Sequence, residues 1–144
     1  MKRIVWIIVS LFVTPCTVVG DTVVDVFFLA GQSNASGRVS TGYAMDPRDA
    51  RIAYYYRTDG PSENNITSGG EFLPLQPLPS GYYGPEVSIG RNLLSLGYNP
   101  ALIKISEGST SLADEWNSRS DGTWWQHWVN DVADALSDLE TDGR

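Results

Sequence analysis

The sequence has little cysteine, little histidine and little positive charge, and each shortage limits what the chain can do. Its 144 residues include one cysteine, Cys16, and one histidine, His127. This excludes an internal disulfide framework and a cluster of thiolate ligands, so we expect neither a metal nor another cofactor. Lysine and arginine number 10 against 17 acidic residues, which gives a net charge of −7. That balance argues against a nucleic-acid backbone or an anionic membrane surface as the main partner.

What the chain does contain fits one globular domain. Hydrophobic residues make up 42% of the sequence, aromatic residues 11% and charged residues 19%. This composition excludes a disordered or low-complexity chain. A chain of this length forms one modest domain and not two.

The first twenty residues are typical of a secretory signal peptide. Met1–Arg3 carries two positive charges, Ile4–Val13 is an almost uninterrupted apolar run, and Val18–Gly20 precedes the expected cleavage site. The apolar run is shorter than the roughly 20 residues that a transmembrane helix needs. We expect cleavage after Gly20, with a cut nearer Cys16 or a buried N-terminal strand as the alternatives. Residues 21–144 would then be a secreted or periplasmic domain without a membrane anchor.

Apolar patterns in the rest of the chain predict alternating strands and helices. The first strand is a nearly continuous apolar run, typical of a strand buried on both faces. Strands and helices in this order form an α/β domain with a doubly wound, mostly parallel sheet and flanking helices. The predicted strands are Val23–Ala30, Arg51–Arg57 and Ala101–Ser106. The first predicted helix begins at Pro85 and ends before Gly97, and the second runs from Trp125 to Leu139. Residues 58–83 and 107–123 are predicted loops.

The last predicted helix is amphipathic. Its apolar residues recur at spacings of three and four, which places them on one face. Its acidic residues would lie on the side that faces water. The apolar set is Trp125, Trp128, Val129, Val132, Leu136 and Leu139, and the acidic set is Asp131, Asp134, Asp138 and Glu140.

Two polar segments follow predicted strands and are candidates for a functional site. Gly31–Asn34 follows the first strand, and Glu107–Ser111 follows the third. Open α/β sheets bind ligands outside the carboxyl ends of their strands. A sharp turn at Ser33 would expose its hydroxyl among free backbone N–H groups, as a serine nucleophile requires. The alternative is a serine that only stabilises the turn.

Three segments resemble the SGNH hydrolases, in the branch of the sialate O-acetylesterases and acetylxylan esterases. DVFFLAGQSNASGR, from Asp25 to Arg38, resembles the first block of that branch. Gly84–Arg91 (GPEVSIGR) resembles its GPE-V-x-x-G-R helix start. Ala101–Leu112 (ALIKISEGSTSL), with Trp116, resembles its strand-EGGTSL-W block. The resemblance implies a flavodoxin-like SGNH hydrolase fold and a carbohydrate O-acetylesterase that acts on sialic acid or on a plant or other polysaccharide.

The resemblance also implies roles for individual residues. Ser33 matches the nucleophile and supplies one backbone N–H to the oxyanion, and Gly108 matches the glycine that supplies a second. Ser109 stands where the branch usually has another glycine. Gln32 and Asn34 flank the nucleophile, and either contact the substrate or only shape the turn.

Other polar and aromatic residues near these blocks have two interpretations each. Glu86, in the first turn of its helix, is expected to be structural rather than catalytic. Trp116 either stacks on a sugar ring of the acetylated carbohydrate or packs in the core, and the same choice holds for Tyr82 and Tyr83. The tyrosines at positions 54–56 are expected in the core.

Two motifs of that branch are missing from the 144 residues. Neither its D-x-x-H base motif nor its W-x-Q-G-E segment occurs, and the residue three before His127 is Trp124. We therefore expect an incomplete SGNH esterase domain that lacks its C-terminal strands. The alternative is a non-catalytic carbohydrate-binding remnant.

Overall fold

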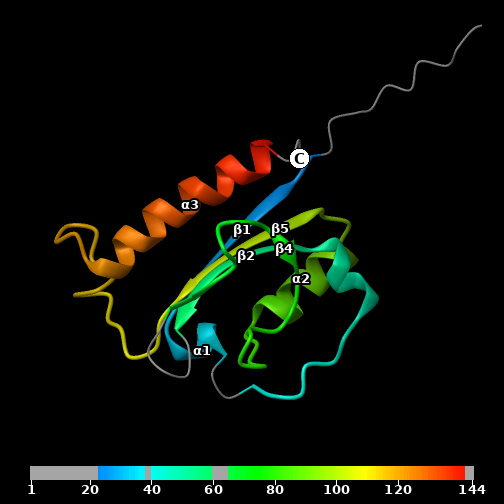
Figure 1. Ribbon diagram of the computed structural model, residues 1–144, viewed down its shortest axis with the longest axis horizontal. Helices are drawn as coiled ribbons and strands as arrows, with labels where there is room; N and C mark the ends of the chain where they lie inside the picture. The colour runs from blue at the N-terminus through cyan, green and yellow to red at the C-terminus, as the bar shows by residue number, and fades with distance from the viewer. Residues whose placement is uncertain (1–22, 38–39, 60–64, 142–144) are drawn as a thin grey trace, which may run out of the picture.

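Three parallel strands form the centre of the fold: β1 (Asp25–Gly31), β5 (Pro100–Ser106) and β2 (Ala53–Asp59). They belong to a five-stranded sheet with the order β1-β5-β2-β3, in which β3 (Asn65–Thr67) and β4 (Leu73–Pro74) both pair antiparallel with β2. The structure is a computed structural model that describes residues 23–37, 40–59 and 65–141 (Figure 1).

The register aligns the carboxyl ends of the three parallel strands. Gly31 of β1 pairs with Ser106 of β5, and Ser106 pairs with Thr58 of β2. The central strand β5 is buried along its whole length. Segments that leave β1, β5 and β2 therefore emerge at one edge of the sheet.

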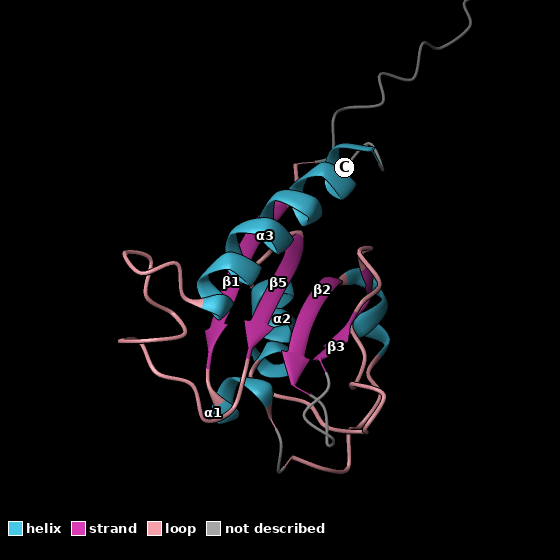
Figure 2. Ribbon diagram, turned by 60° about the vertical axis from the view of Figure 1, so that its left-hand side comes forward, coloured by secondary structure: helices cyan, strands magenta, loops and turns pink. Residues whose placement is uncertain are grey.

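Helices cover both faces of the sheet. The helix α2 (Glu86–Ser95) packs on one face and α3 (Thr123–Thr141) on the other (Figure 2). Successive side chains of a strand point to opposite faces, so Tyr54 and Tyr56 join the core under α2 while Tyr55 joins the core under α3. The protein is an α/β domain with a mostly parallel mixed sheet and flanking helices, which is compatible with a flavodoxin-like fold.

The predicted elements are confirmed with small shifts at their ends. β2 begins two residues late because Arg51 belongs to a 3-10 helix, η1 (Pro47–Arg51), which was not predicted. α2 begins directly after Pro85 and ends before Gly97. Gly97 has a φ of +91°, a conformation that favours glycine after a helix. A one-turn helix, α1 (Ser33–Ser36), follows β1.

The prediction that the first strand is buried on both faces is wrong. β1 pairs only with β5 among the strands that the structure describes, and so it forms an edge of the sheet. Phe28 is 47% exposed as a result, although its ring contacts Trp128 of α3. An apolar strand at an open edge is a site of self-association.

The prediction that residues 58–83 form one long loop is wrong. Two short strands, β3 and β4, pair with β2, and Leu75 and Leu78 belong to the core under α2. Strands of three and two residues carry no detectable periodicity, so the sequence pattern did not reveal them.

The prediction that Asp131 faces water is wrong. It is 3% exposed and accepts hydrogen bonds from Nε and Nη2 of Arg57, which compensates its charge. Val129 and Leu136, placed on the apolar face, are 45% and 40% exposed. The ion-pair partner of Asp131 is distant in the sequence, so the local pattern could not show that this carboxylate is buried.

The signal peptide predicted at residues 1–20 lies outside the described residues. Within the described part of the chain, no helix is both long enough and apolar enough to span a membrane.

A second ion pair joins η1 to α2. The buried carboxylate of Asp49 accepts hydrogen bonds from Nε and Nη2 of Arg91 at 2.8 and 2.7 Å, and from the Tyr43 hydroxyl at 2.6 Å. Burial alone would raise the pKa of Asp49, but the hydrogen bonds from Arg91 and Tyr43 lower it below its usual value. This cluster anchors the connection between β1 and β2 on the α2 face.

We predict that Arg91→Met lowers the free energy of unfolding by about 2–3 kcal/mol, because it leaves the Asp49 carboxylate buried without its cation. Urea denaturation measures the change. The control Arg48→Met removes an exposed arginine paired with Asp46 and should leave stability close to that of the wild type. Equal losses in the two variants would contradict the assigned role.

The same pair predicts a pH effect. Because the folded-state pKa of Asp49 is lowered, its stabilisation is present above the unfolded-state pKa and is lost as the pH falls through the folded-state pKa. From about pH 5 downward, the wild type should therefore lose more stability than Arg91→Met.

Candidate active site

Two loops lie side by side at the carboxyl edge of the sheet. Gln32 and Ser33 follow β1, and Glu107–Ser111 follows the neighbouring strand β5. Ser33 is exposed at the first position of α1, and its carbonyl accepts a hydrogen bond from the N–H of Gly37 at 2.9 Å. Figure 2 shows α1 beneath the arrowheads of β1 and β5.

Hydrogen bonds join the two loops. The side-chain amide of Gln32 donates to the carbonyl of Thr110. The Thr110 hydroxyl donates to the Glu107 carbonyl at 2.9 Å and accepts from Nε1 of Trp116 at 2.8 Å. A cavity of about 100 Å³ lies between the loops, lined by Ala30, Gly31, Gln32, Leu112 and Trp116.

A third segment, before α2, packs against α1. Gly37 has a φ of +79°, and a Cβ atom there would lie 2.0 Å from the carbonyl oxygen of Tyr83. A Cβ atom on Gly84 would lie 2.5 Å from the carbonyl oxygen of Ala35. Backbone meets backbone at both places, so neither position has room for a side chain.

A buried ion pair lies directly behind these backbone contacts. The ammonium of Lys104, in β5, donates to Oε2 of Glu86 at 2.9 Å and to the carbonyl of Ser36 at 3.2 Å. The other carboxylate oxygen of Glu86 accepts from the N–H of Gly84 at 2.7 Å. Both charged side chains are almost completely buried. The pair therefore links β5, α1 and the start of α2.

Hydroxyl groups continue this network across the strand ends. The buried hydroxyl of Ser106 lies 3.2 Å from that of Ser36 and 3.0 Å from that of Thr58. Within the described residues the buried Tyr54 hydroxyl has no hydrogen-bond partner. Burial, followed by the nearby negative charge of Glu86, raises the pKa of Tyr54 well above its usual value, so it stays protonated.

The structure places the two predicted oxyanion residues at the ends of neighbouring strands. Gly108 is buried two residues after β5, while Ser33 and its neighbour Asn34 are exposed. Ser109 has a φ of +64°, at the position where the resembling branch usually has glycine. That backbone conformation favours glycine.

The chain matches no protein-family model, no curated protein and no solved structure.

The aromatic residues considered as sugar contacts differ in how deeply they are buried. The three tyrosines at positions 54–56 are buried in the sheet and lie in the core, as expected. Tyr82 and Tyr83 are half-buried, and the ring of Tyr83 packs edge-on against Tyr43. Trp116 is half-buried beside the small cavity, which leaves part of its surface available to a ligand.

His127 contacts a different group of residues. Its ring packs edge-on against Trp124 with centroids 5.1 Å apart. Burial and the positive charge of Arg57 lower its pKa, against the opposing effect of Asp131. His127 lies on α3, and its exclusion as the base stays a prediction.

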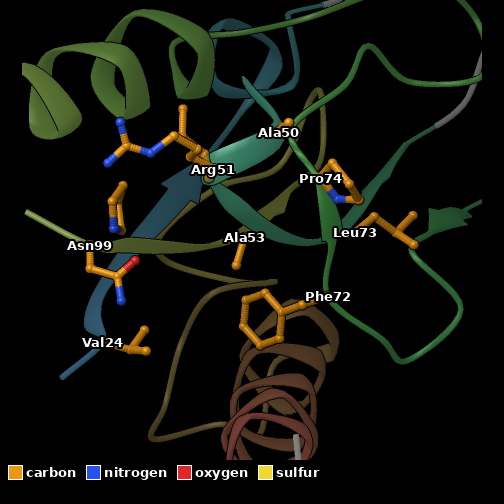
Figure 3. Close-up of a pocket in the computed structure, with 10 residues that line it drawn as sticks. Val24, Ala50, Arg51, Ala53, Phe72, Leu73, Pro74 and Asn99 are labelled. Carbon is orange, nitrogen blue, oxygen red and sulfur yellow. The ribbon is translucent and has the colours of Figure 1, made fainter. Parts of the chain in front are cut away.

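A larger cavity lies at the opposite edge of the sheet. It has a volume of about 380 Å³ and surrounds the amino ends of β2 and β5, with Arg51, Phe72 and Asn99 in its wall (Figure 3). It is separate from the loops that follow β1 and β5. No group of three or more His, Cys, Asp or Glu side chains that could hold a metal occurs in the described ranges.

Lys104 was not predicted as part of the site. It is the one charged residue in the apolar segment ALIKIS, and a buried lysine requires a partner. The pattern therefore indicates a buried, paired lysine, and the structure identifies its partner as Glu86.

We predict that Gly37→Ala is much more destabilising than Gly42→Ala. The two glycines have φ values of +79° and +80°, but a Cβ atom on Gly42 meets no atom within 4 Å. Gly42→Ala should cost about 1–2 kcal/mol from backbone strain alone, and Gly37→Ala at least about 2 kcal/mol more. Urea denaturation compares them, and similar losses would show that α1 does not pack on Tyr83 as described.

Proposed function

We propose that this protein carries the nucleophile and oxyanion loops of a carbohydrate O-acetylesterase of the SGNH-hydrolase type, which acts on O-acetyl groups of sialic acid or of a plant or other polysaccharide. The 144 residues contain no D-x-x-H base motif, and by themselves they should show little or no esterase turnover. The observation that carries the proposal is the position of Ser33 at the carboxyl end of β1, beside the Gly108 loop of β5. The three segments that resemble this family are the same three that meet around α1.

In the proposed reaction the Ser33 hydroxyl attacks the carbonyl carbon of the acetyl group. The backbone N–H groups of Ser33 and Gly108 stabilise the negative charge that develops on the carbonyl oxygen. The Ser33 proton passes to solvent water as Oγ bonds to the carbonyl carbon, the ester C–O bond breaks, and the sugar leaves as an alcohol after taking a proton from water. Water then hydrolyses the acetyl-enzyme to acetate and free Ser33. No metal takes part in the proposed mechanism.

The small cavity has room for the acetyl group of the proposed substrate. It adjoins Gln32, the residue before the nucleophile, and is lined mainly by apolar groups of Leu112 and Trp116. The exposed face of Trp116 is available to the attached sugar.

One observation favours a second function, that of a carbohydrate-binding protein without catalysis. The 144 residues contain no D-x-x-H motif, and the single histidine packs against Trp124. A serine hydroxyl needs a positioned base to become an effective nucleophile. The same loops would then bind an acetylated sugar without cleaving it.

We predict that an aryl acetate acetylates Ser33 slowly, with little turnover. Oxyanion stabilisation without the base leaves only about 10³–10⁴-fold over water, and an acetyl-enzyme lacking a base to activate water should persist. Peptide mass spectrometry should therefore find one acetyl group on Ser33.

The controls separate this reaction from surface acetylation. Ser33→Ala should lose the label, whereas Ser88→Ala, at an exposed serine of α2, should keep it. Equal labelling of the Ser33→Ala protein would contradict the proposed nucleophile. Rapid turnover that both Ser33→Ala and His127→Ala abolish would identify His127 as the base and overturn our assignment of it.

We also propose that the protein is exported and loses residues 1–20. N-terminal sequencing of the secreted or periplasmic fraction should find a chain that begins near Asp21. Ile8→Arg, which interrupts the apolar run, should block export. An intact Met1 in the exported protein would contradict this proposal.

A further inference from the structure

We propose that the buried pair of Lys104 and Glu86 positions the nucleophile, by fixing α1 relative to Gly84 and so setting the orientation of Ser33. This inference rests on the proposed function. Neither residue reaches a substrate, because both are buried behind the turn.

The contacts of the pair converge on the end of α1. Lys104 donates to the carbonyl of Ser36, the last residue of α1, at 3.2 Å. Glu86 accepts from Gly84, whose backbone packs against the carbonyl of Ala35. The strand β5 and the start of α2 thus hold the same short segment from two sides.

Internal hydrogen bonds carry this constraint to Ser33. The N–H groups of Ala35 and Ser36 donate to the Gln32 carbonyl at 2.8 and 3.0 Å, and the N–H of Gly37 donates to the Ser33 carbonyl at 2.9 Å. A single helical turn is not stable by itself in water. The geometry of α1 therefore depends on its contacts with the rest of the protein, and the hydrogen bond from Lys104 is one of these contacts.

Stability alone does not account for two charges at this place. Apolar residues of similar volume often replace a buried ion pair with no loss of stability. They cannot donate to the Ser36 carbonyl or accept from the Gly84 N–H, and these are the directional contacts that fix a backbone. We therefore assign the pair a positioning role.

A cysteine introduced in place of Ser33 reports on this role without a catalytic base. In a protein with both Cys16→Ser and Ser33→Cys, the introduced thiol is the only one, and the N–H groups proposed to stabilise the oxyanion would also stabilise its thiolate. The rate of alkylation by iodoacetamide as a function of pH gives the pKa of this thiol and its limiting rate. A purely structural contact far from position 33 would alter neither.

The test variant adds Glu86→Gln and Lys104→Met to this parent, which removes both charges and keeps the shapes similar. The pKa of its introduced thiol should rise by about one unit toward that of free cysteine, because displaced N–H groups stabilise the thiolate less. The control adds Arg57→Met and Asp131→Asn, which removes another ion pair on the α3 face, and should leave the pKa of the introduced thiol within about 0.2 units of the parent value. No change in the test variant, or equal changes in both, would overturn the inference.

The result separates the inference from the proposed function. If the introduced thiol of the parent protein titrates like free cysteine, with a pKa of about 8.5, the N–H groups do not stabilise an anion and the proposed function fails. If its pKa is lowered but does not respond to the test substitutions, only the positioning role fails.

A second variant covers the case in which the double substitution prevents folding. Gly84→Ala keeps both charges but forces a Cβ atom to within 2.5 Å of the Ala35 carbonyl. In the same Ser33→Cys parent, it should raise the pKa of the introduced thiol by a similar amount. An unchanged pKa in a folded Gly84→Ala protein would overturn the inference.

Discussion

Lys104 lies in the central strand β5, where every other side chain is apolar or a hydroxyl, and its charge must be compensated inside the protein. Glu86 compensates it from the first turn of α2, and the Ser36 carbonyl takes a second hydrogen bond. A carboxylate and an ammonium at 2.9 Å in a buried site allow little freedom of position. The start of α2 and the end of α1 therefore have one relative arrangement, set by β5.

The arrangement of the carboxyl edge follows from this contact and from the parallel register. Gly31, Ser106 and Thr58 end adjacent strands at the same level, so the loops after β1 and β5 must meet. The hydrogen bond from Gln32 to Thr110 joins these loops on one side of α1, and the backbone contact of Gly37 with Tyr83 holds α1 on the other. Three segments that are distant in the sequence thereby surround one exposed serine.

Much of this fold could be predicted because long apolar patterns determine strands and helices directly. The placement of Ser33 and Gly108 on neighbouring strands was also accessible, since parallel strands share their carboxyl edge. The sequence did not reveal β3 and β4, which exist only through their pairing with β2. Nor did local pattern show that Asp131 is buried, because its partner Arg57 lies far away in the sequence. Contacts between distant residues decide these features, and helical or strand periodicity does not contain them.

A crystal structure of the protein after reaction with an aryl methylphosphonate tests the central claim most directly, because the adduct imitates the tetrahedral intermediate on the nucleophile. We predict phosphorus bonded to Oγ of Ser33, one phosphonate oxygen within hydrogen-bond distance of the backbone N–H groups of Ser33 and Gly108, and the Lys104–Glu86 pair intact behind α1. An adduct on another residue, or a phosphonate oxygen directed away from both N–H groups, would contradict this claim.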